Sequence, residues 1–243
     1  MSSEALKYYK GEPAPFPVPF PYIHHDEDET NFYRESTEID RSFYQYCLGF
    51  GIDLSRFEGA RTLNIGAGYH ARFANEAKAY GLDVVSVNPN WQYVEKRVPD
   101  HTGQPWQGDG MSVAATAQHL PFTDGSFDLI LSLWGVPAYL PGTVSEYRQA
   151  FTEIDRVMND GAIALFYPLH WDLVAQKEFT DILDDTVGAH TILTGGNYPK
   201  LFIAKHVYPE DMDIIEDLLS HLDKPSEAYV HCLNPPDMGT KPQ

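Results

Sequence analysis

A glycine-containing turn is the part of this sequence whose residue types point most directly to chemistry. The run Thr62-Leu63-Asn64-Ile65-Gly66-Ala67-Gly68-Tyr69-His70 passes from apolar residues into a Gly-x-Gly turn and then into a segment that reads as a helix. Glycine lets the backbone turn tightly and approach a ligand that a Cβ would push away, which is how an α/β sheet opens a nucleotide site. Asn64 and His70 are unusual polar residues in this run, and Asn88 is a third at the end of the next strand.

Two further groups of side chains could take part in a reaction. Trp134 and Tyr139 follow a continuous apolar run, and their rings could face a cationic group or could be ordinary core aromatics. His170 follows the next apolar run and could act as a general base near neutral pH, or it could be a structural or exposed residue. The residue types alone leave these alternatives open.

Strands and helices alternate around these residues. We predict strands at 61–65, 83–88, 112–116, 127–134 and 162–167, and helices at 36–50, 70–80, 91–97, 143–158 and 171–183. A strand–turn–strand pattern at 191–194 and 200–205 predicts a terminal hairpin, and a last amphipathic helix carries Met212, Ile215, Leu219 and Leu222. This order predicts a mostly parallel sheet with helices on both faces and an antiparallel hairpin at its end.

The helix at 143–158 has the clearest local signals. Thr143-Val144-Ser145-Glu146 is a capping box at its start, and Asn159-Asp160-Gly161 is expected to end it. Its predicted buried face consists of Val144, Tyr147, Phe151, Ile154 and Met158.

Length and composition fit one α/β domain with extensions. The chain has 243 residues, of which 43% are hydrophobic. We assign residues 1–35 to an extension that alternates proline with apolar residues and then becomes acidic, 36–233 to the domain and 234–243 to a flexible tail. The extension could cap the site, cover a hydrophobic patch or form a dimer contact. The stretch His24-His25-Asp26-Glu27-Asp28-Glu29 reads as an acidic solvated loop, so we predict no metal site.

Charge narrows the set of partners. The formal net charge is −18, which disfavours nucleic acid and anionic lipid and suits a small, neutral to cationic substrate. No apolar run is long enough to cross a membrane, and the N-terminus lacks an apolar signal core, so we expect a cytoplasmic protein. Oligomeric state is not indicated, and a homodimer or a protein partner remains open.

Four segments together resemble the class I S-adenosylmethionine-dependent methyltransferases, in particular their small-molecule type. They are the glycine turn with its strand (62–68), Leu120-Pro121-Phe122-Thr123-Asp124-Gly125-Ser126-Phe127-Asp128-Leu129-Ile130, Glu153-Ile154-Asp155-Arg156-Val157-Met158-Asn159-Asp160-Gly161, and the hairpin at 190–207. The resemblance covers roughly residues 40–207. It implies a Rossmann-like, seven-stranded α/β fold, S-adenosylmethionine as cofactor and S-adenosylhomocysteine as product.

The resemblance also implies where the cofactor lies. The turn residues Asn64, Gly66, Ala67 and Gly68 would face its methionine part, Asn88 and Pro89 its ribose, Thr116 and Ala117 its adenine, and Trp134 its methyl sulfonium. His70 could line the cofactor pocket from the start of the next helix or could be an exposed residue in its first turn. On the acceptor side, the resemblance makes Tyr139 and His170 the candidate catalytic residues. A Gly-x-Gly turn followed by Asn88 also meets the dinucleotide fingerprint formally, although the hairpin departs from that fold.

The chain departs from the family at four positions. The family has acids at the positions of Asn64 and Asn88, a glycine at that of His70 and often an aspartate at that of Thr116. Asn88 can still hydrogen-bond a ribose, and Asp109 could supply a compensating carboxylate. If Asn88 faces the ribose, Asn88→Asp should tighten cofactor binding.

The predicted function is therefore methyl transfer to an unidentified small molecule by direct in-line displacement. The alternatives are a non-catalytic methyltransferase-like binding or partner protein and, third, an NAD-dependent oxidoreductase.

Overall fold

The chain forms a seven-stranded sheet between two layers of helices. We describe it from a computed structural model, which places residues 41–68, 71–89, 112–138, 140, 142–194, 198–208 and 211–222. The strand order is β3-β2-β1-β4-β5-β7-β6, with β1 Arg61–Ile65, β2 Asp83–Val87, β3 Ser112–Val113, β4 Phe127–Leu133, β5 Met158–Tyr167, β6 Ala189–Leu193 and β7 Lys200–Ala204. Strands β1 to β5 pair in parallel, whereas β7 runs antiparallel to both β5 and β6. The predicted fold class is confirmed.

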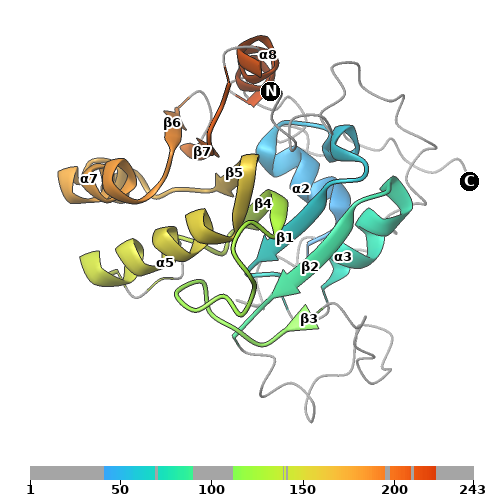
Figure 1. Cartoon of the computed structure of the whole chain (residues 1–243), viewed down its shortest axis with the longest axis horizontal. Helices are drawn as coiled ribbons and strands as arrows, with labels where there is room; N and C mark the ends of the chain where they lie inside the picture. Colours follow the sequence, from blue (N-terminus) through green and yellow to red (C-terminus); the bar gives the residue numbers. More distant parts are fainter. Residues whose placement is uncertain are drawn as a thin grey trace, which may run out of the picture.

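Helices cover both faces of the sheet (Figure 1). One apolar cluster joins the sheet to α2 (Phe43–Phe50), α3 (Arg72–Ala77) and α8 (Met212–Leu222). The other cluster joins it to α5 (Val144–Val157) and α7 (Lys177–Thr186). Short helices occur at η2 (Leu54–Phe57), η3 (Lys78–Tyr80) and α6 (Trp171–Val174). Burial of alternate strand residues on the two faces makes this arrangement a three-layer sandwich.

Helices α2 and α5 begin at capping boxes. The Thr143 hydroxyl accepts a hydrogen bond from the Glu146 amide, as predicted, and Ser42 does the same with Gln45. On α5 the buried residues are Ala150, Phe151, Ile154 and Val157. Val144 was expected on this face, but it is 51% exposed because it lies in the first turn, beyond the edge of the core.

Three sequence predictions of element boundaries are wrong. Helix α5 ends at Val157, and residues 158–161 belong to β5 because Met158 pairs with Phe127 and the Gly161 amide donates to the Lys205 carbonyl (2.6 Å). The strand expected at 112–116 is only Ser112–Val113, since residues 116–119 fold into a turn. The helix expected at 171–183 is broken into α6 and α7 at Gln176, whose backbone is extended.

A buried lysine ties two helices to the sheet. Lys200 is 8% exposed, and its ammonium donates to the carbonyls of Phe50 (2.8 Å) and Leu222 (2.9 Å), the last residues of α2 and α8. A cation at a helix C-terminus satisfies carbonyls without an intrahelical partner and interacts favourably with the helix dipole. Lys200 therefore fixes α2 and α8 at the same corner of the sheet.

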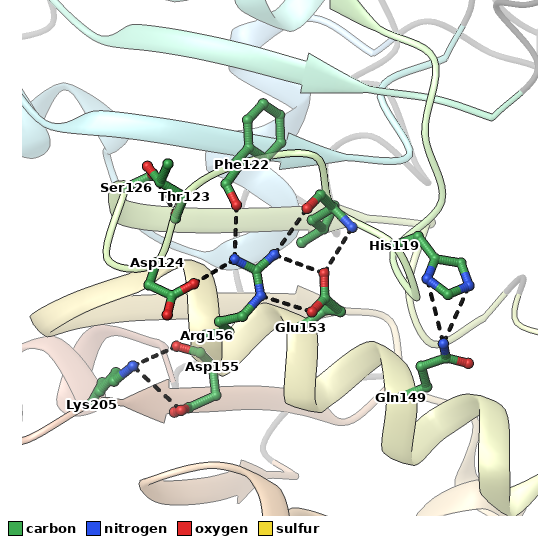
Figure 2. A network of polar contacts seen from close by, with 11 residues as sticks. His119, Phe122, Thr123, Asp124, Ser126, Gln149, Glu153, Asp155, Arg156 and Lys205 are labelled. Atoms are coloured by element: carbon green, nitrogen blue, oxygen red, sulfur yellow. Dashed lines mark hydrogen bonds and ion pairs between the residues drawn. The ribbon is translucent and has the colours of Figure 1, made fainter.

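The segment before β4 is held by an ion-pair network on α5 (Figure 2). The Arg156 guanidinium pairs with Glu153 (2.8 Å) and Asp124 (2.7 Å) and donates to the carbonyls of Phe122 (2.8 Å) and Leu120 (2.9 Å). Glu153 in turn accepts from the Leu120 amide (3.0 Å). The hydrogen bonds from Arg156 lower the pKa of the Glu153 carboxyl, and those to Glu153 raise the pKa of Arg156. The segments 120–130 and 153–161, two of the four that carry the family resemblance, are thus the two halves of one clamp.

Other predictions concern parts that the structure does not place. The extension at 1–35, the helix at 91–97 and the tail at 234–243 lie outside the described residues. Among the residues that are described, no helix is both long and apolar enough to cross a membrane.

Candidate functional site

The Gly-x-Gly turn lies at the carboxyl edge of the sheet, directly after β1. Gly66 and Gly68 both have positive φ angles (81° and 75°). The amides of Gly66 and Ala67 donate to the carbonyl of Val87, the last residue of β2 (2.9 and 3.3 Å). The turn is therefore fixed to the neighbouring strand, and ligands of open α/β sheets bind at this edge.

The turn after β1 also contacts the turn after β4. A Cβ on Gly66 would lie 2.7 Å from the Gly135 Cα, and a Cβ on Gly135 would lie 2.5 Å from the Ile65 carbonyl oxygen. The Ser132 hydroxyl joins the two turns, since it donates to the Ile65 carbonyl (2.9 Å) and accepts from the Val136 amide (2.7 Å). Two glycines are needed because backbone packs on backbone here.

Asn64 is fully buried under this turn. Its Oδ1 accepts a hydrogen bond from the hydroxyl of Tyr46 on α2 (2.8 Å). The ring of Tyr46 stacks on Phe73 of α3. Among the described residues, neither the Asn64 Nδ2 nor the Oγ of Ser86, its register partner on β2, has a hydrogen-bond partner. Two unsatisfied polar atoms thus lie on adjacent strands beneath the turn, where each would gain from a polar ligand or a buried water.

Asn88 follows β2 and is nearly buried, at 8% exposure. Its Nδ2 donates to the Gly68 carbonyl at 2.6 Å, so the amide crosses from the end of β2 to the turn after β1. Pro89 follows it on the surface. His70 and Asp109, the other residues expected near this point, lie outside the described residues.

Thr116 and Ala117 form a turn before β4. The Thr116 carbonyl accepts from the His119 amide (3.1 Å), and the side chain of Ala117 is buried against the α5 face of the sheet. The turn can therefore contact a ligand through its backbone, rather than through the methyl group of Ala117.

Trp134 stands at the end of β4 in a left-handed conformation (φ 59°), which is uncommon for a bulky residue and frequent at functional sites. The Arg41 guanidinium lies 5.7 Å from its ring centroid, and Tyr198 packs edge-on against it (5.9 Å). Tyr198 also contacts Tyr167 at the end of β5. One face of the indole therefore already holds a cation that belongs to the chain.

His170 lies beyond the end of β5, as predicted, but its side chain is exposed. It occupies the N-cap position of α6 through its carbonyl, and its imidazole forms no cap hydrogen bond. Tyr139, the other candidate catalytic residue, is not among the described residues. Within the part of the chain that is described, no three His, Cys, Asp or Glu side chains are placed to hold a metal ion.

Several site residues were not found by sequence reasoning. Arg41 and Tyr46 come from the residue before the cap of α2 and from α2 itself, outside the four motif segments, and Tyr198 lies in the hairpin but was given no role there. Ser132 and Gly135 lie next to the candidate residue Trp134 in sequence, but their roles in joining the turns depend on distances between strands. Local sequence carried no signal for either kind of contact.

The donor set fits a polar, nucleoside-containing cofactor through neutral hydrogen bonds. The described carboxyl ends of β1 and β2 present amides and a hydroxyl (Asn64, Asn88 and Ser86) in place of carboxylates. The Nδ2 of Asn64, which has no partner among the described residues, can donate to an oxygen.

Residues 63–166 match a family described as methyltransferase domain. Similar solved structures include an S-adenosylmethionine-dependent methyltransferase from Methanosarcina mazei (15% identical, 62% of this chain and 94% of that one, TM-score 0.41). Others are a putative enzyme of the same kind from Methanococcus maripaludis (14%, 68% and 84%, 0.48) and a 16S rRNA adenine methyltransferase from Catenulisporales acidiphilia (20%, 70% and 94%, 0.41). No curated protein matches the chain. These structures are too distant to indicate a substrate.

Proposed function

We propose, from the match of residues 63–166 to the methyltransferase-domain family, that the protein transfers a methyl group from S-adenosylmethionine to a small molecule by direct in-line displacement. The observation that carries the proposal is the turn after β1. It is tied to β2 through Val87 and packed on the turn after β4 through Gly66 and Gly135. These contacts hold a backbone surface at the sheet edge, where such folds bind ligands.

S-adenosylmethionine, when bound, supplies a methyl group on a positively charged sulfur. The residues of this chain would bind and orient it: the backbone of 66–68 its methionine part, Asn88 and Pro89 its ribose and the turn at 116–117 its adenine. Compared with family members that have a carboxylate at this position, an amide at position 88 gives up a charge-assisted hydrogen bond to the ribose, worth about 1.5–3 kcal/mol or roughly 10- to 100-fold in affinity. In this chain the amide also donates to the Gly68 carbonyl, which an ionised carboxylate could not do. We therefore propose a working site of reduced affinity.

The proposed acceptor is a small molecule rather than nucleic acid or a membrane surface. The net charge of −18 opposes the approach of a polyanion. The end of β4 supplies an aromatic wall in Trp134 and Tyr198 that could line an acceptor pocket. Because His170 is exposed and forms no supporting hydrogen bond, we propose that proximity of acceptor and methyl group, rather than a general base, drives the reaction.

Calorimetry with S-adenosylmethionine, S-adenosylhomocysteine and NAD tests this function. We expect binding of the first two, with S-adenosylhomocysteine in the micromolar range, and none of NAD. Failure of all three to bind at millimolar concentration would leave the non-catalytic partner protein as the better description. That alternative has one observation in its favour, because both acid positions of the site hold amides bonded to the protein itself.

A further inference from the structure

The polar residue after β2 holds the turn after β1 from the inside. Asn88 Nδ2 donates to the Gly68 carbonyl at 2.6 Å, and the residue is 8% exposed. The adjacent residue, Val87, accepts from the Gly66 and Ala67 amides through its carbonyl. The end of β2 thus contacts three successive residues of the turn, with Asn88 providing the donor and Val87 the acceptor.

We propose that Asn88 is a positioning residue, whose amide locks the glycine turn in the shape that binds the cofactor. The proposal rests on the proposed function for the identity of the ligand, while the lock itself is a property of the free chain. An aspartate could not replace Asn88, since an ionised carboxylate has no proton to donate and would face the Gly68 carbonyl with a second acceptor.

The charge pattern around the turn supports this assignment. Asn64, the other amide of the site, is also engaged with the protein through the Tyr46 hydroxyl. Among the described elements around Asn88, β3 contributes only Ser112 and Val113, and the charged residues Arg72 and Glu76 of α3 pair with each other. An added carboxylate at position 88 would find no cation among these groups, which leaves protonation as its way to become a donor.

Asn88→Asp therefore tests the proposal by the sign of its pH dependence. At about pH 8 we expect the variant to bind S-adenosylhomocysteine about 10- to 100-fold more weakly than the unaltered protein. Because a protonated carboxyl can donate to the Gly68 carbonyl, the deficit should shrink as the pH falls toward about 5. Taking the ratio of the two proteins at each pH removes the titration of the ligand itself.

Asn75→Asp is the matched control, because it makes the same change at an exposed position of α3. Its affinity should stay within about twofold of the unaltered protein at both pH values. Tighter binding by Asn88→Asp at about pH 8 would mean that position 88 acts as an ordinary ribose acceptor, and it would overturn the proposal. Equal affinity at both pH values would overturn it as well.

Hydrogen exchange of the ligand-free protein separates this proposal from the proposed function. At about pH 8 the Gly66 and Ala67 amides should exchange at least about tenfold faster in Asn88→Asp than in Asn75→Asp, since the turn loses one of its ties to β2. This result is expected even if no S-adenosyl compound binds. Unchanged exchange would rule out the lock, whatever the protein binds.

Discussion

At the residue scale, the glycines allow backbone to pack against backbone at the sheet edge. Gly66 and Gly135 belong to turns 69 residues apart in sequence, and a Cβ on either would press into the other turn. Ser132 completes the contact with a buried hydroxyl that bonds to both turns. Any side chain at Gly135 would press on the backbone at Ile65 and Gly66, which cannot rotate away, and on the Ser132 hydroxyl that joins the two turns.

Gly135→Ala should therefore weaken S-adenosylhomocysteine binding by about tenfold or more and destabilise the fold by about 1–3 kcal/mol. Gly188→Ala is the control, because its Cβ would also press on backbone, 2.9 Å from the Ala204 carbonyl oxygen, but at the far hairpin. Calorimetric affinity and thermal unfolding should separate the two variants. Equal affinity in both would show that the contact between turns has no role in binding.

At the element scale, the clamp on α5 determines where the segment before β4 runs. Arg156 and Glu153 lie one helical turn apart, and together they bind the backbone of residues 120–122 as well as the Asp124 carboxylate. The Gly125 and Ser126 amides then donate to the carbonyls of Arg156 and Val157 at the end of the helix. These hydrogen bonds and ion pairs position the turn at 116–119 and the start of β4 relative to the sheet edge.

Glu153→Gln should cost about 1–3 kcal/mol of stability at neutral pH, since it removes a charge-assisted acceptor and brings an NH2 group against other donors. The folded pKa of Glu153 is lowered, so its contribution is present above its unfolded pKa and is lost as the pH falls through the folded value. The difference between the two proteins should therefore shrink below about pH 4.5, as chemical denaturation would show.

Asp181→Asn controls for the loss of an ion-pair carboxylate, because its partner Lys177 is 82% exposed. It should leave the unfolding midpoint unchanged at every pH. A constant difference between Glu153→Gln and the unaltered protein down to pH 3 would contradict the role assigned to the carboxylate.

At the scale of the whole molecule, the net charge destabilises the fold and the burial of apolar side chains stabilises it. The chain carries a net charge of −18, while the apolar clusters on the two faces of the sheet hold it together. The buried Lys200 is a local exception, since its charge is balanced by the carbonyl ends of α2 and α8. Self-repulsion is spread over the surface and should therefore be sensitive to ionic strength.

Raising sodium chloride from about 20 mM to about 300 mM should increase the melting temperature by about 2–4 °C, equivalent to roughly 1 kcal/mol. Exposed ion pairs such as Arg148–Asp185 contribute little and lose little on screening. Differential scanning fluorimetry would measure the shift, with a neutral osmolyte of equal osmolality as control. A lower melting temperature in salt would mean that ion pairs outweigh the repulsion.

Sequence determined the fold of this protein through local signals. The buried strands at 127–133 and 162–167 follow from continuous apolar runs, and the start of α5 follows from the capping box at Thr143. Helix boundaries could not be predicted from local signals, because they depend on pairing and packing with distant segments. Met158 belongs to a strand, and the helix expected at 171–183 is interrupted at Gln176.

The position of the Gly-x-Gly turn could also be predicted from the sequence, because two closely spaced glycines directly after an apolar run indicate a tight turn, and both have positive φ in the structure. What the polar residues do was decided only by the tertiary structure. Asn88 was a candidate ribose ligand in the sequence, and the fold gives its amide the Gly68 carbonyl, 20 residues away. Arg41 and Tyr46 contact site residues although they lie outside every motif, and the sequence of the hairpin did not indicate that Tyr198 packs on Trp134. A hydrogen bond depends on the distance and direction between two groups, and those are set when separate strands and helices pack together.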